Sequence, residues 1–214
     1  MIRSHHRHLL WDWNGTLVDD LDLCVDIVNG MLGRRQLPRI DVPAYHAQFD
    51  FPVRGFYERL GFDLQGDAFA ELSQEFIGEF DARRLEAQLH DGVDALLARV
   101  TASGREQSIL SAHRQVTLHE IVALRGIDRH FSTMAGLDDA HAHGKIDRGH
   151  ALVQELALPP QSLILVGDTL HDLEVARALG IDCVLVARGH HAKERLRASG
   201  ARVVDDLREL GEAL

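Results

Sequence analysis

The sequence predicts an α/β protein: a Rossmann-like parallel sheet flanked by helices, with an inserted α-helical cap domain. In the C-terminal portion, short continuous apolar runs alternate with longer amphipathic stretches, a pattern typical of parallel strands covered on both faces. Between residues 21 and 88 helical periodicity replaces this alternation. We therefore expect an α/β core made of residues 1–20 and 89–214, and a helical cap at residues 21–88.

The first expected strand is the apolar run His8–Trp11, which ends at Asp12. Gly15 and Thr16 then allow a tight turn away from the strand. The cap follows, and within residues 69–80 apolar side chains recur at helical spacing in the order Phe69, Leu72, Phe76, Ile77 and Phe80. The cap therefore interrupts the core just after its first strand.

The core resumes after the cap with alternating strands and helices. Further strands are expected at Gln107–Leu110, Ser162–Val166 and Ile181–Ala187. Helices are expected at His113–Arg125, from near Asp147 to Leu158, and at Asp172–Leu179, Ala192–Ala198 and Asp206–Ala213. Pro159-Pro160 ends the second of these helices, and Gly180 suits a helix C-cap.

Composition restricts the class of protein. The 214 residues carry a net charge of −10 and show no Lys/Arg cluster, so we expect no nucleic-acid partner. No segment approaches the roughly 20 apolar residues of a membrane helix, and the N-terminus lacks the apolar core of a signal peptide. The two cysteines, Cys24 and Cys183, are far apart, which favours a reducing, cytoplasmic location without a disulfide.

Reactive side chains follow the expected strands at the edge where open α/β sheets bind ligands. Asp12 ends the first strand, and a carboxylate there can attack phosphorus. Ser111 ends the strand at Gln107–Leu110, where a hydroxyl and N–H groups at a helix start form an anion site. Lys145 precedes the helix near Asp147 and can balance the charge of Asp12 and a phosphate. Taken singly, each has an ordinary alternative as a turn, cap or surface residue.

Gly167-Asp168-Thr169-Leu170-His171-Asp172 directly follows a buried strand. Asp168 and Asp172 are four residues apart and are expected on one face of the first helical turn. Repulsion between the two carboxylates is offset if they share a cation. Hard oxygen ligands suit Mg²⁺, which predicts a magnesium site here.

These residues, in this order, resemble the motifs of the haloacid dehalogenase superfamily hydrolases, of the phosphoglycolate-phosphatase-like branch with a helical cap. The first family motif is DxDGT, matched by Asp12 to Thr16 with Asn14 in place of the second Asp. Ser111 and Lys145 match the second and third motifs, and Gly167 to Asp172 matches the fourth, GDxxxD. The resemblance covers essentially the whole chain.

The resemblance implies a Mg²⁺-dependent phosphatase that acts on a small phosphorylated metabolite through an aspartyl-phosphate. It implies that Asp12 is the nucleophile, that Ser111 and Lys145 contact the phosphate, and that Asp12, the Asn14 carbonyl, Asp168 and Asp172 hold the metal. Asp172 ligates the metal directly or through water. Thr16, Ala112 and the cap residue Arg54 complete the expected substrate contacts, with Arg34, Arg35 and Arg188 as weaker candidates.

Asn14 departs from the family pattern at the position of the acid/base Asp. An amide forms hydrogen bonds but cannot exchange a proton near neutral pH, and general acid–base catalysis typically contributes about 10²–10⁴-fold. We therefore expect a slow phosphatase, or one selective for leaving groups that need little protonation, such as aryl or acyl phosphates. One alternative is a catalytically impaired phosphate-binding or regulatory protein. Another is deamidation at Asn14-Gly15, which would restore the missing acid.

Overall fold

The structure is a computed structural model, and it describes residues 2–137 and 144–211. A six-stranded parallel sheet has the strand order β5-β4-β1-β6-β7-β8. These strands are β1 (His8–Trp11), β4 (Glu106–Arg114), β5 (Thr133–Leu137), β6 (Leu163–Gly167), β7 (Asp182–Val186) and β8 (Arg202–Val204). The predicted Rossmann-like fold class is confirmed.

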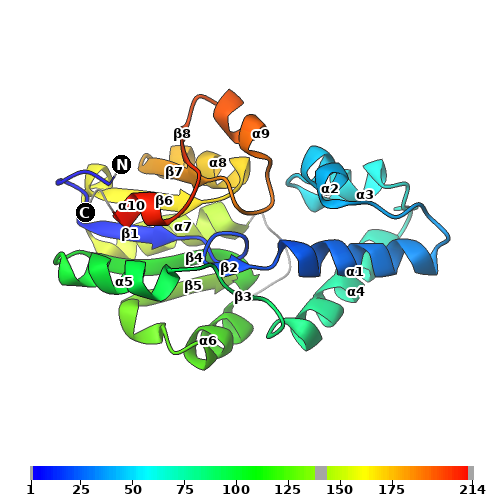
Figure 1. The fold of residues 1–214 in the computed structure, drawn as a ribbon, viewed down its shortest axis with the longest axis horizontal. Coiled ribbons are helices and arrows are strands. Elements are labelled where there is room, and N and C mark those ends of the chain that lie inside the picture. The colour runs from blue at the N-terminus through cyan, green and yellow to red at the C-terminus, as the bar shows by residue number, and fades with distance from the viewer. Residues whose placement is uncertain (1, 138–143, 212–214) are drawn as a thin grey trace.

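Helices cover both faces of this sheet (Figure 1). Leu9 and Trp11 of β1 face one cluster of buried side chains, and Leu10 faces the other, as strand alternation requires. The first cluster includes α5 (Val93–Ala102), α6 (Gln115–Leu124) and α10 (Arg208–Gly211). The second includes α7 (Gly144–Leu156) and α8 (Leu170–Leu179), while α9 (Lys193–Ala198) contacts β8.

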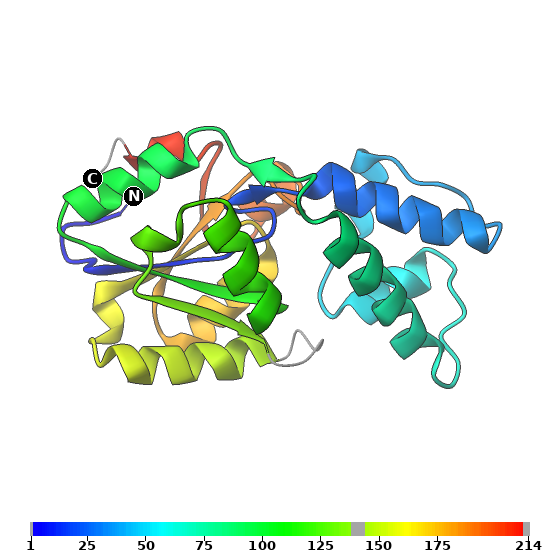
Figure 2. The same cartoon turned by 90° about the horizontal axis from the view of Figure 1, so that it is seen from below.

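Four helices lie beyond the carboxyl ends of the strands, in both views of the ribbon (Figures 1 and 2). They are α1 (Leu21–Arg34), α2 (Val42–Gln48), α3 (Val53–Arg59) and α4 (Ala68–Arg83). The short antiparallel pair β2 (Val18–Asp19) and β3 (Gln88–Leu89) joins the chain leaving the core to the chain returning. We propose that residues 21–88 form the cap domain.

Several element boundaries differ from prediction. Most expected helices and strands shift by one to three residues, but β4 extends from the expected Leu110 to Arg114, because Arg114 still pairs with Leu137 across an irregularity in register. The helix expected from near Asp147 already begins at Gly144. Gly180 is the left-handed C-cap of α8, as predicted. The last two residues of the helix expected at Asp206–Ala213 lie outside the described residues.

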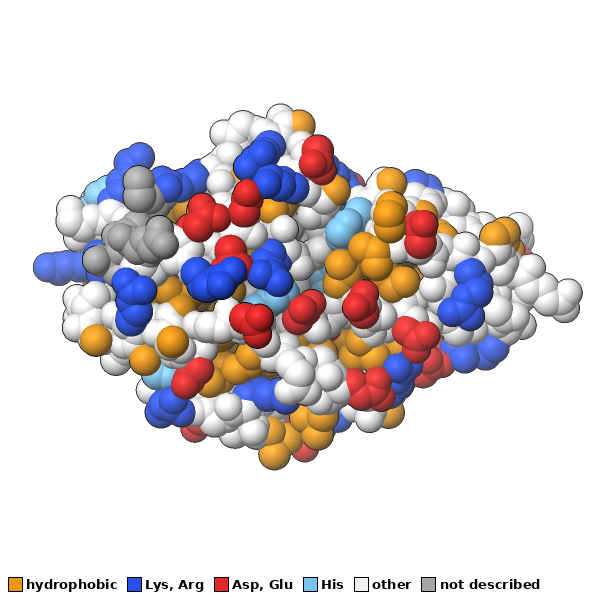
Figure 3. Space-filling view, viewed as in Figure 1, with side chains coloured by type: hydrophobic (Ala, Val, Ile, Leu, Met, Phe, Trp, Pro, Cys, Tyr) orange, Lys and Arg blue, Asp and Glu red, His pale blue; other side chains and the backbone are white. Residues whose placement is uncertain are grey.

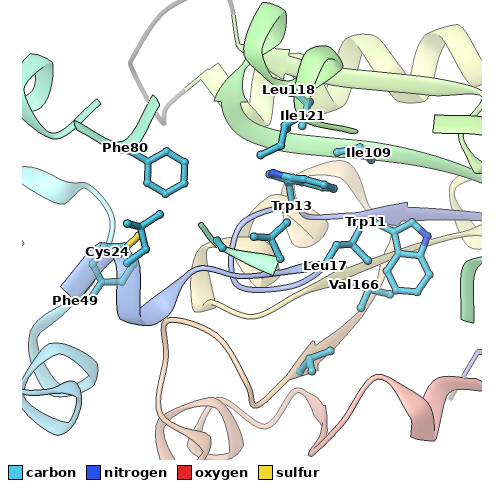
Figure 4. Close-up of a cluster of buried hydrophobic side chains, with 14 of the residues drawn as sticks. Trp11, Trp13, Leu17, Cys24, Phe49, Phe80, Ile109, Leu118, Ile121 and Val166 are labelled. Carbon is cyan, nitrogen blue, oxygen red and sulfur yellow. The ribbon is translucent and has the colours of Figure 1, made fainter. Parts of the chain in front are cut away.

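The apolar core continues from the sheet into the four helices. Figure 4 shows Trp13, two residues after the end of β1, beside Leu118 and Ile121 of α6, while Phe80 of α4 lies near Cys24 of α1. Trp13 is fully buried. Because the residue that follows Asp12 is anchored in this core, the turn that carries the reactive residues is held on both sides by packing.

Candidate active site

Asp12, Lys145 and Asp172 form a buried ionic cluster at the end of the sheet. Asp12 continues the ladder of β1, because its N–H donates to the Val166 carbonyl at 2.9 Å. The Lys145 ammonium donates to Asp12 Oδ1 at 2.6 Å and to Asp172 Oδ1 at 2.7 Å. All three side chains are at least nine-tenths buried. Although burial opposes it, the pair of carboxylates raises the pKa of Lys145, which therefore stays charged.

Asp172 also caps the helix that carries it. Its Oδ2 accepts from the Thr169 backbone N–H at 3.0 Å and from the Thr169 hydroxyl at 2.7 Å. Thr169 is the N-cap of α8, so Asp168 precedes the helix and does not share a helical turn with Asp172, contrary to the sequence expectation. Despite burial, Lys145 and Thr169 hold the pKa of Asp172 below its ordinary value.

Asp168 is held by a second set of contacts. Thr16 Oγ1 donates to its Oδ1 at 2.9 Å, and the His190 backbone N–H donates to its Oδ2 at 2.6 Å. A Cβ on Gly15 or on Gly189 would lie only 2.4 or 2.1 Å from Asp168 Oδ2, so both glycines are required by close approach. Thr16 is fully buried, and we therefore propose a positioning role for it in place of the expected substrate contact.

These carboxylates fit a divalent cation. Asp12, Asp168 and Asp172 each offer an oxygen, and the three oxygens lie within 4.8 Å of one another. Burial raises the pKa of Asp12 against the pull of Lys145, and it raises that of Asp168 to about 6, so the cluster is short of positive charge. A hard, oxygen-binding cation would supply that charge. Asp172 already accepts three hydrogen bonds, one of them from the Lys145 ammonium, whereas Asp168 accepts two, so we propose that Asp172 reaches the metal through water.

Ser111 and Ala112 lie within β4 and line the same cavity as Asp12. The Ser111 Oγ accepts from the His113 backbone N–H at 3.1 Å. The sequence placed a helix start directly after Ser111, but α6 begins at Gln115, so the expected helix N-terminus is not at this serine. Among the described residues the Ser111 hydroxyl has no acceptor for its hydrogen, which can therefore rotate toward a phosphate oxygen.

Asn14 is bound by a carboxylate that the sequence analysis missed. Its Nδ2 donates to Asp20 Oδ2 at 2.6 Å, and the Gly15 N–H donates to Asp20 Oδ1 at 2.7 Å. The amide oxygen faces His113 Nδ1 at 3.3 Å. Deamidation requires the Gly15 nitrogen to attack the Asn14 side chain, and both groups are tied to Asp20, so this arrangement opposes the deamidation hypothesis.

His190 completes the base of the site, and it too was missed. Its Nε2 lies 3.3 Å from Asp20 Oδ1, and its Nδ1 lies 3.1 Å from the Tyr45 hydroxyl of α2. Although burial opposes it, Asp20 raises the pKa of His190 to about 9, so the ring carries a charge near neutral pH. The available sequence signals were Asp20 just after the turn and the His190-His191 pair after a strand, but neither matches a motif spacing.

A cavity of about 440 Å³ extends from Asp12, Ser111 and Lys145 into the four helices. Arg54 lines it, as expected, but its Nη2 donates to the Leu64 carbonyl at 3.0 Å. The weaker arginine candidates lie elsewhere, since none of them lines this cavity. Arg34 and Arg35 pair with Glu75 and Glu79, and Arg188 pairs with Asp206.

The family model described as haloacid dehalogenase-like hydrolase matches residues 9–186. This range includes the ends of β1, β4 and β6, which carry the site, and the helices α1 to α4. The chain belongs to this family. Its predicted place in the phosphoglycolate-phosphatase-like branch is confirmed by relatives such as the phosphoglycolate phosphatase of Pseudomonas syringae, which is 28% identical over 94% of this chain and 77% of its own.

Other family members carry different names. The tyrosine-protein kinase PtkA of Mycobacterium tuberculosis is 29% identical over 94% of this chain and 71% of its own. The solved structure of that protein covers 99% of both chains with a TM-score of 0.80 at 26% identity. A predicted phosphatase from Clostridium acetobutylicum shares the fold with a TM-score of 0.83 over 97% of both chains at 21% identity. Because these names disagree, family membership leaves the substrate open.

Proposed function

We propose that this hydrolase is a Mg²⁺-dependent phosphatase that acts on a small phosphorylated metabolite through an aspartyl-phosphate on Asp12. The observation that carries the proposal is the arrangement of Asp12. One of its oxygens is held by Lys145, and its side chain lines the cavity together with Ser111. The nucleophile, the phosphate contacts and the cation ligands thus converge at one end of the sheet.

In the first step, the Asp12 carboxylate attacks phosphorus and the leaving-group oxygen departs with its electron pair. Ser111 and Lys145 hold phosphoryl oxygens, which stabilises the charge that builds up on them. Mg²⁺, held by Asp12, the Asn14 carbonyl and Asp168, would neutralise the phosphoryl charge. Water then attacks the aspartyl-phosphate, releasing inorganic phosphate and free Asp12.

Asn14 restricts which phosphates can react. Its amide has no proton to give to the leaving group, and its Nδ2 is already bound to Asp20. At about 1.4 kcal/mol per decade, the loss of general acid catalysis costs roughly 3–5 kcal/mol of barrier lowering. We therefore propose that the enzyme selects esters whose leaving group departs without protonation.

The test is a panel of aryl, acyl and alkyl phosphates, assayed with and without Mg²⁺. Turnover of the aryl and acyl members that is abolished by Asp12→Asn is the expected result. The matched control is Asp19→Asn, which changes an exposed carboxylate on β2. Full activity in Asp12→Asn would overturn the assignment of the nucleophile.

The Asn14–Asp20 hydrogen bond also favours a second candidate, a catalytically impaired phosphate-binding or regulatory protein. In that case no phosphate in the panel is turned over, while Mg²⁺ and inorganic phosphate still bind.

Nucleic acid and membranes are not proposed as partners. Basic and acidic side chains are interspersed on the face in Figure 3, without a basic patch. Among the described residues, no helix is long and apolar enough to span a membrane.

A further inference from the structure

The cap side of the cavity is built from aromatic side chains. Tyr45 and Phe49 stack with ring centroids 4.9 Å apart and an interplanar angle of 11°. Phe76 and Phe80 of α4 stack at 6.0 Å and 19°. All four line the cavity, and Phe49 and Phe80 are labelled near Cys24 in Figure 4. At about 440 Å³, the cavity lies within the roughly 300–1,000 Å³ of small-molecule sites.

The lysine and arginine side chains that line the cavity offer little to a second anionic group on the substrate. Among the described residues, the lysine and arginine side chains that line it are Arg54, Arg114 and Lys145. Arg54 pairs with Glu58 at 3.3 Å, and its guanidinium carbon lies 5.3 Å from the Phe69 ring centroid.

The other cations that line the cavity are engaged as well, including the His190 ring, which pairs with Asp20 at 3.3 Å. Arg114 pairs with Asp81 at 3.3 Å, and Lys145 is shared by the two carboxylates that face it. A substrate with a carboxylate at its far end would therefore meet aromatic rings and paired cations. Burying an unpaired charge in such surroundings is costly.

We propose that the substrate is an aryl phosphate monoester whose aromatic ring occupies the cap side of the cavity while its phosphoryl group reaches Asp12. This inference rests on the proposed function and adds the identity of the leaving group. Aromatic rings favour stacked and edge-to-face contacts with one another, and the stacked pairs above provide surfaces for them.

The chemistry agrees with the packing. Asp12 Oδ forms a bond to phosphorus while the bond between phosphorus and the phenolic oxygen breaks, and the phenolate leaves with the electron pair. The phenolate takes its proton from water, so the reaction needs no proton donor at Asn14. Water hydrolyses the aspartyl-phosphate, and the products are a phenol and inorganic phosphate.

The first test measures binding without turnover. Phenylphosphonate and methylphosphonate carry the same anionic group, and only one carries a ring. With Mg²⁺ present, calorimetry should show phenylphosphonate bound at least about tenfold more tightly. Phe76→Ala should remove most of that preference, whereas Leu85→Ala, at a half-exposed position that does not line the cavity, should keep it. Equal binding of the two phosphonates would overturn the inference.

The second test separates the two proposals by turnover. Phenyl phosphate and acetyl phosphate both have leaving groups that depart without an acid, but acetyl phosphate has no ring. Phe76→Ala should lower kcat/KM for phenyl phosphate about tenfold more than it lowers kcat/KM for acetyl phosphate, mainly through KM. An equal loss on both substrates would contradict ring recognition. If the wild-type protein prefers phenylphosphonate but hydrolyses neither phosphate, the proposed function fails while the aromatic subsite stands.

Discussion

Replacing Asn14 with Asp should not by itself restore general acid catalysis. The Asn14 Nδ2 lies 2.6 Å from Asp20 Oδ2, so the substitution places two carboxylate oxygens where a hydrogen bond was. At that distance and an effective dielectric constant near 20, two full charges repel by about 6 kcal/mol. That repulsion corresponds to roughly 4–5 pKa units, so the pair keeps one shared proton near neutral pH.

A carboxyl pair that shares one proton is a poor acid for the reaction, because loss of that proton restores the repulsion between the two carboxylates. Exchanging both partners removes the problem. In Asn14→Asp/Asp20→Asn the new amide can donate to the new carboxylate, and its oxygen can still accept from the Gly15 N–H. We expect less than tenfold improvement in alkyl-phosphate turnover for the single variant, and about 10²–10⁴-fold for the double variant.

The assay is kcat for an alkyl phosphate at saturating Mg²⁺, with Asp20→Asn alone as the control and thermal unfolding to check the fold. Asp20→Asn should not improve turnover, because the acid is still missing. It should lower Tm, because the buried contact with His190 loses its charge. If Asn14→Asp alone reaches the activity of the double variant, the pairing with Asp20 does not control the acid.

Three further outcomes follow from the same contacts. Gly189→Ala should weaken Mg²⁺ binding by displacing Asp168, whereas Gly33→Ala, whose Cβ meets no atom within 4 Å, should bind normally; calorimetry distinguishes them. Lys145→Met should destabilise the metal-free protein by about 3–5 kcal/mol in urea unfolding, and Mg²⁺ should recover part of the loss. Burial raises the pKa of Asp12 and of Asp168, the latter to about 6, so the metal-free protein loses stability as these groups ionise with rising pH. The Mg²⁺-induced increase in Tm should therefore grow as pH rises through about 6; a pH-independent increase would contradict this.

The sheet and the main site residues could be predicted because they depend on local patterns. Asp12 and Gly167 each stand at the end of an apolar run that forms a parallel strand. The residues at these two strand ends therefore lie at one edge of the sheet, independently of the helices between the strands. The strand end at Ser111 was misplaced, because the four residues after Leu110 are polar or small. They stay in β4 through an irregular pairing with β5 that no local propensity encodes.

Asp20 and His190 could not be found from local pattern. They are 170 residues apart in sequence, and their contact exists only because the segment after β7 passes behind the turn at Gly15. The Leu64 carbonyl that Arg54 contacts was hidden for the same reason, because it lies in the loop beyond α3. Glu58, by contrast, is four residues from Arg54 in the same helix, a spacing that the sequence does show. The sequence shows which side chains can carry a charge. Only the tertiary structure shows which of those charges already have a partner of opposite charge.

Charge balance also separates a working enzyme from a passive phosphate binder. Asp12, Asp168 and Asp172 lie together where Asp12 lines the cavity, with Lys145 as their one ammonium partner among the described residues. A phosphate dianion entering that part of the cavity without a cation would add to an existing excess of negative charge. Phosphate binding should therefore require Mg²⁺, and a protein selected only to bind phosphate would gain from losing the Asp12 charge. The carboxylate of Asp12, placed there against its own electrostatic cost, is what the proposed nucleophile requires.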